Sequence, residues 1–217
     1  MSSVSTSSRL IATLVWFRQD LRLQDNPALS AAILRGAPVI PVYILDETGE
    51  GRWPMGGASR WWLHHSLAAL DGALRARGSQ LVLAQGDSET VLRGLIQATG
   101  ADAVYWNRRY EPAAIARDKK LKAALGVEAT SFNATLLFEP HTIRNKAGGP
   151  FQVFTPFWKH CLGLEVEEPV KLKTGSFPSA AAWPASRSLH ELELGPKLGW
   201  DAGFASVWTP GEEGARV

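Results

Sequence analysis

Five short apolar segments alternate with four helical segments over the first 132 residues of this 217-residue chain. The apolar segments are rich in β-branched and aromatic residues, as buried strands are, and they cover residues 11–17, 39–45, 81–84, 103–106 and 127–132. Because a helix separates each strand from the next, we expect the strands to pair in parallel and the helices to cover both faces of the sheet. The pattern therefore predicts an α/β fold over residues 10–132, a Rossmann-like, doubly wound sheet of five parallel strands.

Local capping chemistry marks where these helices begin and end. Asn26 and Pro27 begin the first helix and Gly36 ends it, while Asp87 begins a later helix with acidic residues in its first turn. Pro41 falls inside the second apolar segment. Since proline cannot donate to a sheet ladder, we expect Pro41 at the first residue of its strand or at a bulge.

The helix between the second and third strands carries the clearest amphipathic stripe. Leucines at spacings of four, three and four form its core-facing side, namely Leu63, Leu67, Leu70 and Leu74. At about 100° per residue, Trp61 points away from this stripe and Trp62 lies on its flank. An outward aromatic side chain of this kind either covers an interface or stacks on a flat ligand.

Fixed charges crowd the end of the first predicted strand, where Arg18, Asp20, Arg22 and Asp25 follow within eight residues. Ligands of open α/β sheets bind at the carboxyl ends of the strands, near the point where the strand order reverses. These side chains therefore either contribute to a ligand site or form an internal ion-pair network that stiffens the turn. Both interpretations remain open from the residues alone.

Composition narrows the class of protein. The chain is 45% hydrophobic and 20% charged, which is typical of a soluble globular protein with one complete core and an appendage. A net charge of +2 predicts no broad basic face for nucleic acid on this piece of chain, and the densest basic cluster is interpreted as a solvated helix face: Arg117, Lys119, Lys120 and Lys122. The single cysteine, Cys161, excludes an internal disulfide and a zinc site built of thiolates.

Targeting signals are not recognised in the sequence. The longest apolar run near the start covers residues 11–17, far short of the roughly 20 residues that cross a bilayer, so no membrane association is expected. Residues 1–9 are interpreted as a flexible N-terminus rather than a secretion signal. We expect a cytoplasmic, monomeric protein.

The strand and helix rhythm stops after residue 132. Residues 133–217 are punctuated by prolines, and only residues 154–162 have a helical pattern. This stretch is predicted to be a long connector that packs along another surface. Its aromatic residues are too numerous for a solvated linker, so some should contact a partner absent from this chain: Phe151, Phe154, Phe157, Trp158, Trp183, Trp200 and Trp208.

Common catalytic signatures are missing. The chain has no G-x-G-x-x-G motif after the first strand, no P-loop, no H-E-x-x-H and no nucleophile elbow. His64 and His65 are adjacent on a helix and point about 100° apart, so they cannot chelate one metal ion together. Cys161 beside His160 is interpreted as a buried or incidental thiol. We therefore predict no metal site, and these motifs identify no catalytic residue in this chain.

Several motifs together resemble the photolyase and cryptochrome family. The opening resembles that of the family in residues 16–22 with Asp25 and Asn26, and collinear likenesses follow at residues 59–63, 131–133, 136–140, 150–151 and 157–158. These segments are most similar to plant cryptochromes and to class III bacterial cyclobutane pyrimidine dimer photolyases. Residues 208–212 resemble the segment that leads into the family's helical flavin domain.

The resemblance implies that residues 10–132 form the antenna-chromophore domain. Residues 133–217 would be the interdomain connector leading to an absent helical domain that binds FAD. The whole protein would be a deoxyribodipyrimidine photo-lyase, which repairs cyclobutane pyrimidine dimers in UV-damaged DNA with light. A blue-light signalling cryptochrome is the alternative, and a free-standing nucleotide-binding module is a third.

The resemblance also implies an antenna pigment, which passes its excitation to FAD. The folate site of classical bacterial photolyases uses an Asn-Glu pair, which is replaced here by Ala113 and Ala114. Methenyltetrahydrofolate at a different position, as in class III enzymes, is the first expectation, and a deazaflavin or FMN is the second. We expect the pigment beside the loop 46–53, held by the candidate residues Glu47, Trp53, Arg60 and Trp61. Arg18, Asp20 and Arg22 are assigned to the crevice and to interdomain contact.

Overall fold

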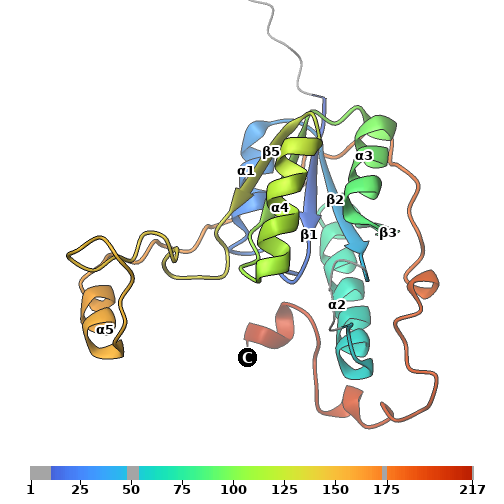
Figure 1. Ribbon diagram of the computed structural model, residues 1–217. Helices are drawn as coiled ribbons and strands as arrows, with labels where there is room; N and C mark the ends of the chain where they lie inside the picture. Colours follow the sequence, from blue (N-terminus) through green and yellow to red (C-terminus); the bar gives the residue numbers. More distant parts are fainter. Residues whose placement is uncertain (1–10, 48–53, 173–174, 217) are drawn as a thin grey trace, which may run out of the picture.

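A five-stranded parallel sheet forms the centre of the computed structural model, which describes residues 11–47, 54–172 and 175–216 (Figure 1). The strands and helices of this α/β body are β1 (Thr13–Phe17), α1 (Pro27–Arg35), β2 (Val39–Leu45), α2 (Gly57–Arg75), β3 (Val82–Gln85), α3 (Ser88–Thr99), β4 (Ala103–Asn107), α4 (Pro112–Ala124) and β5 (Glu128–Phe132). The strand order is β3-β2-β1-β4-β5, and every neighbouring pair is parallel. The predicted doubly wound fold is confirmed.

Two apolar cores lie on the two faces of the sheet. Val15 and Phe17 of β1 point to the core beneath α1 and α2, while Leu14 and Trp16 point to the core beneath α3 and α4. This alternation follows from the two-residue period of a strand, and burial on both faces explains why β1 and β2 are apolar throughout.

The helix boundaries follow the predicted caps. The Asn26 side chain accepts a hydrogen bond from the amide of Leu29, and Gly36 ends α1 with a φ of 77°. The prediction for Pro41 was wrong, because it is the third residue of β2, paired in register with Val15. Proline is accommodated there because β2 pairs with β3 only from Val42 onward.

The described residues from 172 to 216, which we call the trailing segment, return to the α/β body after the chain has left it. Val39 donates its backbone N–H to the carbonyl of Pro178 at 2.7 Å and forms an isolated bridge with Ser179. Four apolar side chains of this segment complete the core beneath α1 and α2: Leu172, Phe177, Leu192 and Leu194. Part of the region predicted as a connector therefore belongs to the packed body.

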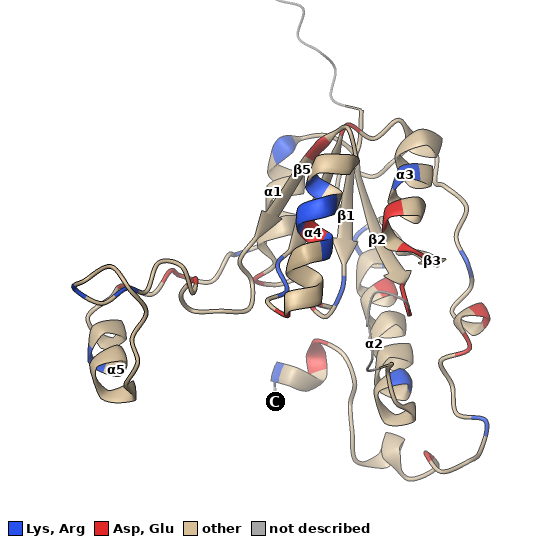
Figure 2. Cartoon of the chain, in the orientation of Figure 1, with Lys and Arg blue, Asp and Glu red and all other residues tan. Residues whose placement is uncertain are grey.

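A different part of this region, the arm that contains the helix at residues 154–162, stands away from the body (Figure 1). We call it the α5 arm. Helix α5 (Phe154–Leu162) has the predicted bounds, is mostly uncharged (Figure 2), and buries only Cys161. Phe154 and Trp158 stack on each other with ring centroids 6.2 Å apart, yet both are exposed. The arm therefore presents an aromatic surface that the described part of the chain does not cover. Among the described residues, no helix is long and apolar enough to cross a membrane.

The role of the trailing segment in the core can be tested with two leucines. Leu192 is 0% exposed, whereas Leu198, only six residues further on, is 76% exposed. Leu192→Ala should lower the free energy of unfolding by about 2–4 kcal/mol, because it leaves a cavity in the core. Leu198→Ala should change the free energy of unfolding by no more than about 0.5 kcal/mol. Equal effects in denaturant titrations would contradict the packing described above.

Candidate functional site

A cavity of about 430 Å³ opens at the carboxyl ends of β1 and β2. Its walls come from the turn after β1, the end of β2, the first half of α2 and residues 211–215. The strand order reverses between β1 and β4, so this edge of the sheet is where ligands of such folds bind. The predicted crevice is therefore present as a cavity of ligand-binding size.

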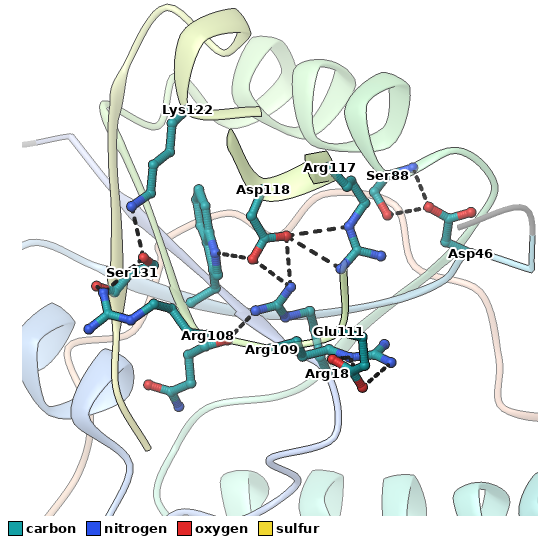
Figure 3. Close-up of polar contacts among 12 residues, drawn as sticks. Arg18, Asp46, Ser88, Arg108, Arg109, Glu111, Arg117, Asp118, Lys122 and Ser131 are labelled. Atoms are coloured by element: carbon teal, nitrogen blue, oxygen red, sulfur yellow. Dashed lines mark hydrogen bonds and ion pairs between the residues drawn. The ribbon is translucent and has the colours of Figure 1, made fainter. Parts of the chain in front are cut away.

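A buried ion pair holds the side chain of Arg18 in place at the wall of this cavity (Figure 3). Its Nη1 lies 2.9 Å and 3.0 Å from the two carboxylate oxygens of Asp118, and its Nη2 donates to the carbonyl oxygen of Asn107. Burial lowers the pKa of the Arg18 guanidinium, and the charge of Asp118 opposes this shift. The pair ties the end of β1 to α4 and β4, one hundred residues further along the chain.

Asn107 extends the network into the turn after β1. Its Nδ2 donates to Asp20 Oδ2 at 2.5 Å and to Asn26 Oδ1 at 2.8 Å, and its Oδ1 accepts from the amide of Ala28 at 3.1 Å. Arg22 donates from Nη2 to the carbonyls of Asp25 and Ala134, each at 2.8 Å. The charges of the turn thus form the structural network that one interpretation expected. Arg18, Asp20 and Arg22 also line the cavity, and a role in ligand binding stays a prediction.

The indole of Trp16 forms another part of the cavity wall. The guanidinium carbons of Arg18 and Arg117 lie 4.8 Å and 5.1 Å from its ring centroid, which is cation–π distance. Its Nε1 and the Nε of Arg18 are buried without a hydrogen-bond partner among the described residues. In contrast, the Nε1 of Trp106 donates to Asp118 at 3.0 Å.

Asp118 serves two guanidinium groups at once. It binds Arg18 tightly, while Arg117 lies 3.4 Å from the same carboxylate oxygen (Figure 3). Asp118 is therefore shared by two guanidinium groups, and the cavity wall beside them carries carboxylates as well, among them Asp20 and Asp46. The prediction of a solvated basic face on α4 was wrong for Arg117, whose side chain packs over Trp16 and lines the cavity.

Asp46 closes the amino terminus of α3. Its Oδ2 accepts from the backbone N–H of Ser88 at 3.1 Å and from the Ser88 hydroxyl at 2.5 Å (Figure 3). This carboxylate already occupies the position at which a helix amino terminus would receive a phosphate. An anionic group in the cavity would therefore be met by Arg117 rather than by the helix.

Two of the four predicted binding residues meet at the cavity. Glu47 and Arg60 form an ion pair of 2.5 Å, both line the cavity, and Arg60 also donates to the carbonyl of Glu193 at 3.2 Å. Trp53 lies outside the described residues.

Trp61 does not reach the cavity wall, and the expectation that it faces outward is corrected. It is 3% exposed, its Nε1 donates to Asp201 Oδ2 at 3.0 Å, and its ring meets Phe204 edge-on at 5.2 Å. The reason is that the trailing segment covers this face of α2. Trp62, which is 42% exposed, lines the cavity instead.

A second cleft of about 580 Å³ also borders the charged turn. Arg108, Tyr110 and Leu136 line it, together with Asp20 and Arg22, which it shares with the first cavity. The Tyr110 hydroxyl contacts Glu139 at 3.0 Å, and burial raises the pKa of this phenol. Within the described residues, no three His, Cys, Asp or Glu side chains gather as a metal site would require.

The ion pair between Arg18 and Asp118 can be tested by its contribution to the stability of the fold. Asp118→Asn should lower the free energy of unfolding by about 3–5 kcal/mol, because it leaves the buried Arg18 charge without its partner. The matched control is Glu111→Gln, since Glu111 pairs with Arg109 at 2.9 Å with about half of its side chain exposed. The control should cost less than about 1 kcal/mol. Similar losses for both variants in urea titrations would contradict the assigned role of Asp118.

Comparison with known proteins agrees with this geometry. Residues 13–173 match the family model described as DNA photolyase. The deoxyribodipyrimidine photo-lyase of Agrobacterium fabrum is 47% identical over 213 residues, which are 96% of this chain and 44% of that protein. Cryptochrome-1 of Arabidopsis thaliana is 37% identical over 209 residues, covering 92% of this chain and 30% of that protein.

Solved structures show the same relationship. The crystal structure of a bacterial class III photolyase from Agrobacterium tumefaciens has a TM-score of 0.85 and 46% identity, covering 99% of this chain and 45% of that one. An archaeal photolyase from Sulfolobus tokodaii gives a TM-score of 0.67 and 28% identity, covering 85% and 42% of the two chains. The chain thus spans less than half the length of these relatives. As its motifs indicated, the chain belongs to the DNA photolyase family.

Proposed function

We propose that this chain is the light-harvesting part of a deoxyribodipyrimidine photo-lyase and that its cavity holds an antenna pigment. In this assignment residues 10–132 form the pigment-binding domain, and residues 133–217 connect it to a helical domain that binds FAD. The observation that carries the proposal is the cavity of about 430 Å³ at the carboxyl ends of β1 and β2, in a member of this family.

The residues around the cavity suit a flat, polar, anionic ligand. Trp62 is 42% exposed and lines the cavity, so its indole is available to a flat ligand. Arg117 lines the cavity and offers a guanidinium to an anionic group, and the pair of Glu47 and Arg60 borders the same space. We assign the aromatic contact to Trp62, since Trp61 is engaged with Asp201, and retain Trp53 as a candidate.

Methenyltetrahydrofolate remains our first choice of pigment, with a deazaflavin or FMN second. When bound, such a pigment would absorb near-UV or blue light and pass the excitation to FAD. Asp46 blocks the amino terminus of α3, which favours a carboxylate on Arg117 over a phosphate at a helix end. A flavin-type pigment as the second choice is supported by the relative from Sulfolobus tokodaii, whose structure is described as containing two FAD molecules, with the implication of a novel light-harvesting cofactor.

The exposed aromatic arm supports the proposed role of the connector. Phe154, Phe157 and Trp158 of α5 are exposed, and relatives are more than twice as long as this chain. A flavin domain of the same polypeptide would cover these side chains. The whole protein would then act on pyrimidine dimers in UV-damaged DNA, as a monomer in the cytoplasm.

Blue-light signalling is the second candidate function. The identities of 37% and 38% to the two Arabidopsis cryptochromes favour it as the alternative. Light-driven loss of pyrimidine dimers, measured with the full-length protein, distinguishes repair from signalling.

Light-driven repair provides the test of the proposed activity. The full-length flavoprotein should remove cyclobutane pyrimidine dimers from irradiated oligonucleotides under blue light and not in the dark, measured by chromatography of the products. Flavin photoreduction without loss of dimers would contradict the photo-lyase assignment and favour signalling.

Pigment binding can be tested with two adjacent tryptophans. Trp62→Ala should weaken the binding of methenyltetrahydrofolate to the full-length protein about tenfold, because losing one aromatic stack costs on the order of 1–3 kcal/mol. Trp61→Phe, which alters a residue outside the cavity wall, should leave the Kd unchanged. Absorption titrations with the folate and with FMN measure both variants. Binding unaffected by Trp62→Ala, or lost only with Trp61→Phe, would contradict the proposed site.

A further inference from the structure

Residues 208–216 form one wall of the cavity although they lie far from its other walls in the sequence. Gly211, Glu212 and Ala215 line the cavity opposite residues of the turn after β1. Trp208 meets Trp62 with ring centroids 6.1 Å apart and an interplanar angle of 77°. The position of residues 208–216 therefore determines how far the cavity is open to solvent.

The carboxylate of Glu212 holds this wall to the turn between β1 and α1. Its Oε2 accepts from the backbone N–H of Leu23 at 2.7 Å, and its Oε1 accepts from the N–H of Gln24 at 3.1 Å. Hydrogen bonds to a charged acceptor are roughly twice as strong as neutral ones. Arg216 lies 2.7 Å from the same carboxylate and 2.9 Å from that of Glu213, so the two glutamates share it. Glu212 thus uses both oxygens for consecutive amides and has its counterion within its own segment.

Gly211 brings the same segment close to α2. It has a φ of 105°, and a Cβ placed on it would lie 2.7 Å from the Cβ of Ala69. Both the left-handed backbone and the close approach require glycine here. Two independent contacts, at Gly211 and at Glu212, therefore fix the wall against α2 and against the turn.

We propose that Glu212 is a positioning residue of the pigment site, and that it slows release of the pigment by holding residues 208–216 closed over the cavity. This inference rests on the proposed function. Glu212 accepts hydrogen bonds from the turn between β1 and α1, and Asp20 and Arg22 of the same turn line the cavity. One carboxylate therefore holds two walls of the cavity together, namely residues 208–216 and this turn. Its own oxygens are occupied by amides and Arg216, which leaves it no direct role in binding the pigment.

The test compares Glu212→Gln with Glu213→Gln in the full-length protein. Glutamine keeps one acceptor oxygen for the two amides and presents an NH₂ group to the other. Glu213 is the matched control, because it pairs with the same Arg216 at 2.9 Å while its side chain is 83% exposed. Glu212→Gln should raise the dissociation rate of methenyltetrahydrofolate roughly tenfold, and Glu213→Gln should not change it.

A pigment-free measurement separates positioning from general destabilisation. In Glu212→Gln, amide hydrogen exchange should accelerate at Leu23 and Gln24, while the midpoint of thermal unfolding stays that of Glu213→Gln. Gly211→Ala should also speed pigment release, because it displaces the same wall without touching the carboxylate.

The possible outcomes distinguish failure of the role of Glu212 from failure of the proposed function. Faster exchange with unchanged pigment release in Glu212→Gln would overturn this inference and leave the proposed function standing. Equal acceleration of release in Glu213→Gln would overturn it as well, since the effect would then be one of charge alone. A wild-type protein that binds no pigment would overturn the proposed function, and this inference with it.

Discussion

The buried ion pair between Arg18 and Asp118 is the interaction on which the rest of the site depends. It joins the end of the central strand to α4, and the carbonyl of Asn107 completes the arrangement at the end of β4. An uncompensated guanidinium at this depth would be very costly, so the geometry of the switch point is strongly determined. The cation–π contacts of Arg18 and Arg117 with Trp16 lie beside this pair, and Arg117 contacts the same carboxylate.

The trailing segment then turns an open sheet edge into a cavity. It packs apolar side chains into the core at Leu192 and Leu194, covers Trp61 on α2, and reaches the turn after β1 through Glu212. The α5 arm, by contrast, keeps its aromatic side chains exposed. One region of the chain therefore combines two physical roles, which are closure of the body and presentation of a docking surface.

Local patterns were sufficient to predict the α/β body, whereas long-range contacts were not accessible to them. Strand periodicity and caps such as Asn26 and Gly36 act within a few residues, and they were confirmed. Helical spacing predicts that Trp61 faces outward, and it does not reveal the partner Asp201, which lies 140 residues further along the chain. Arg117 was assigned to solvent because a helical charge run does not reveal that Trp16 lies beneath it. Glu47 and Arg60 lie on the cavity wall because the end of a strand and the start of the next helix can be located from local patterns, and their role in binding a pigment stays a prediction.

The central claim is that the cavity at the end of β1 and β2 is the place where light is collected. A crystal structure of the full-length protein, reconstituted with methenyltetrahydrofolate, tests this claim most directly. The account predicts density for the ring system against Trp62, with Arg117 near its anionic end and residues 211–215 closing the rim. A ligand seated instead in the cleft beside Arg108 and Tyr110 would contradict it.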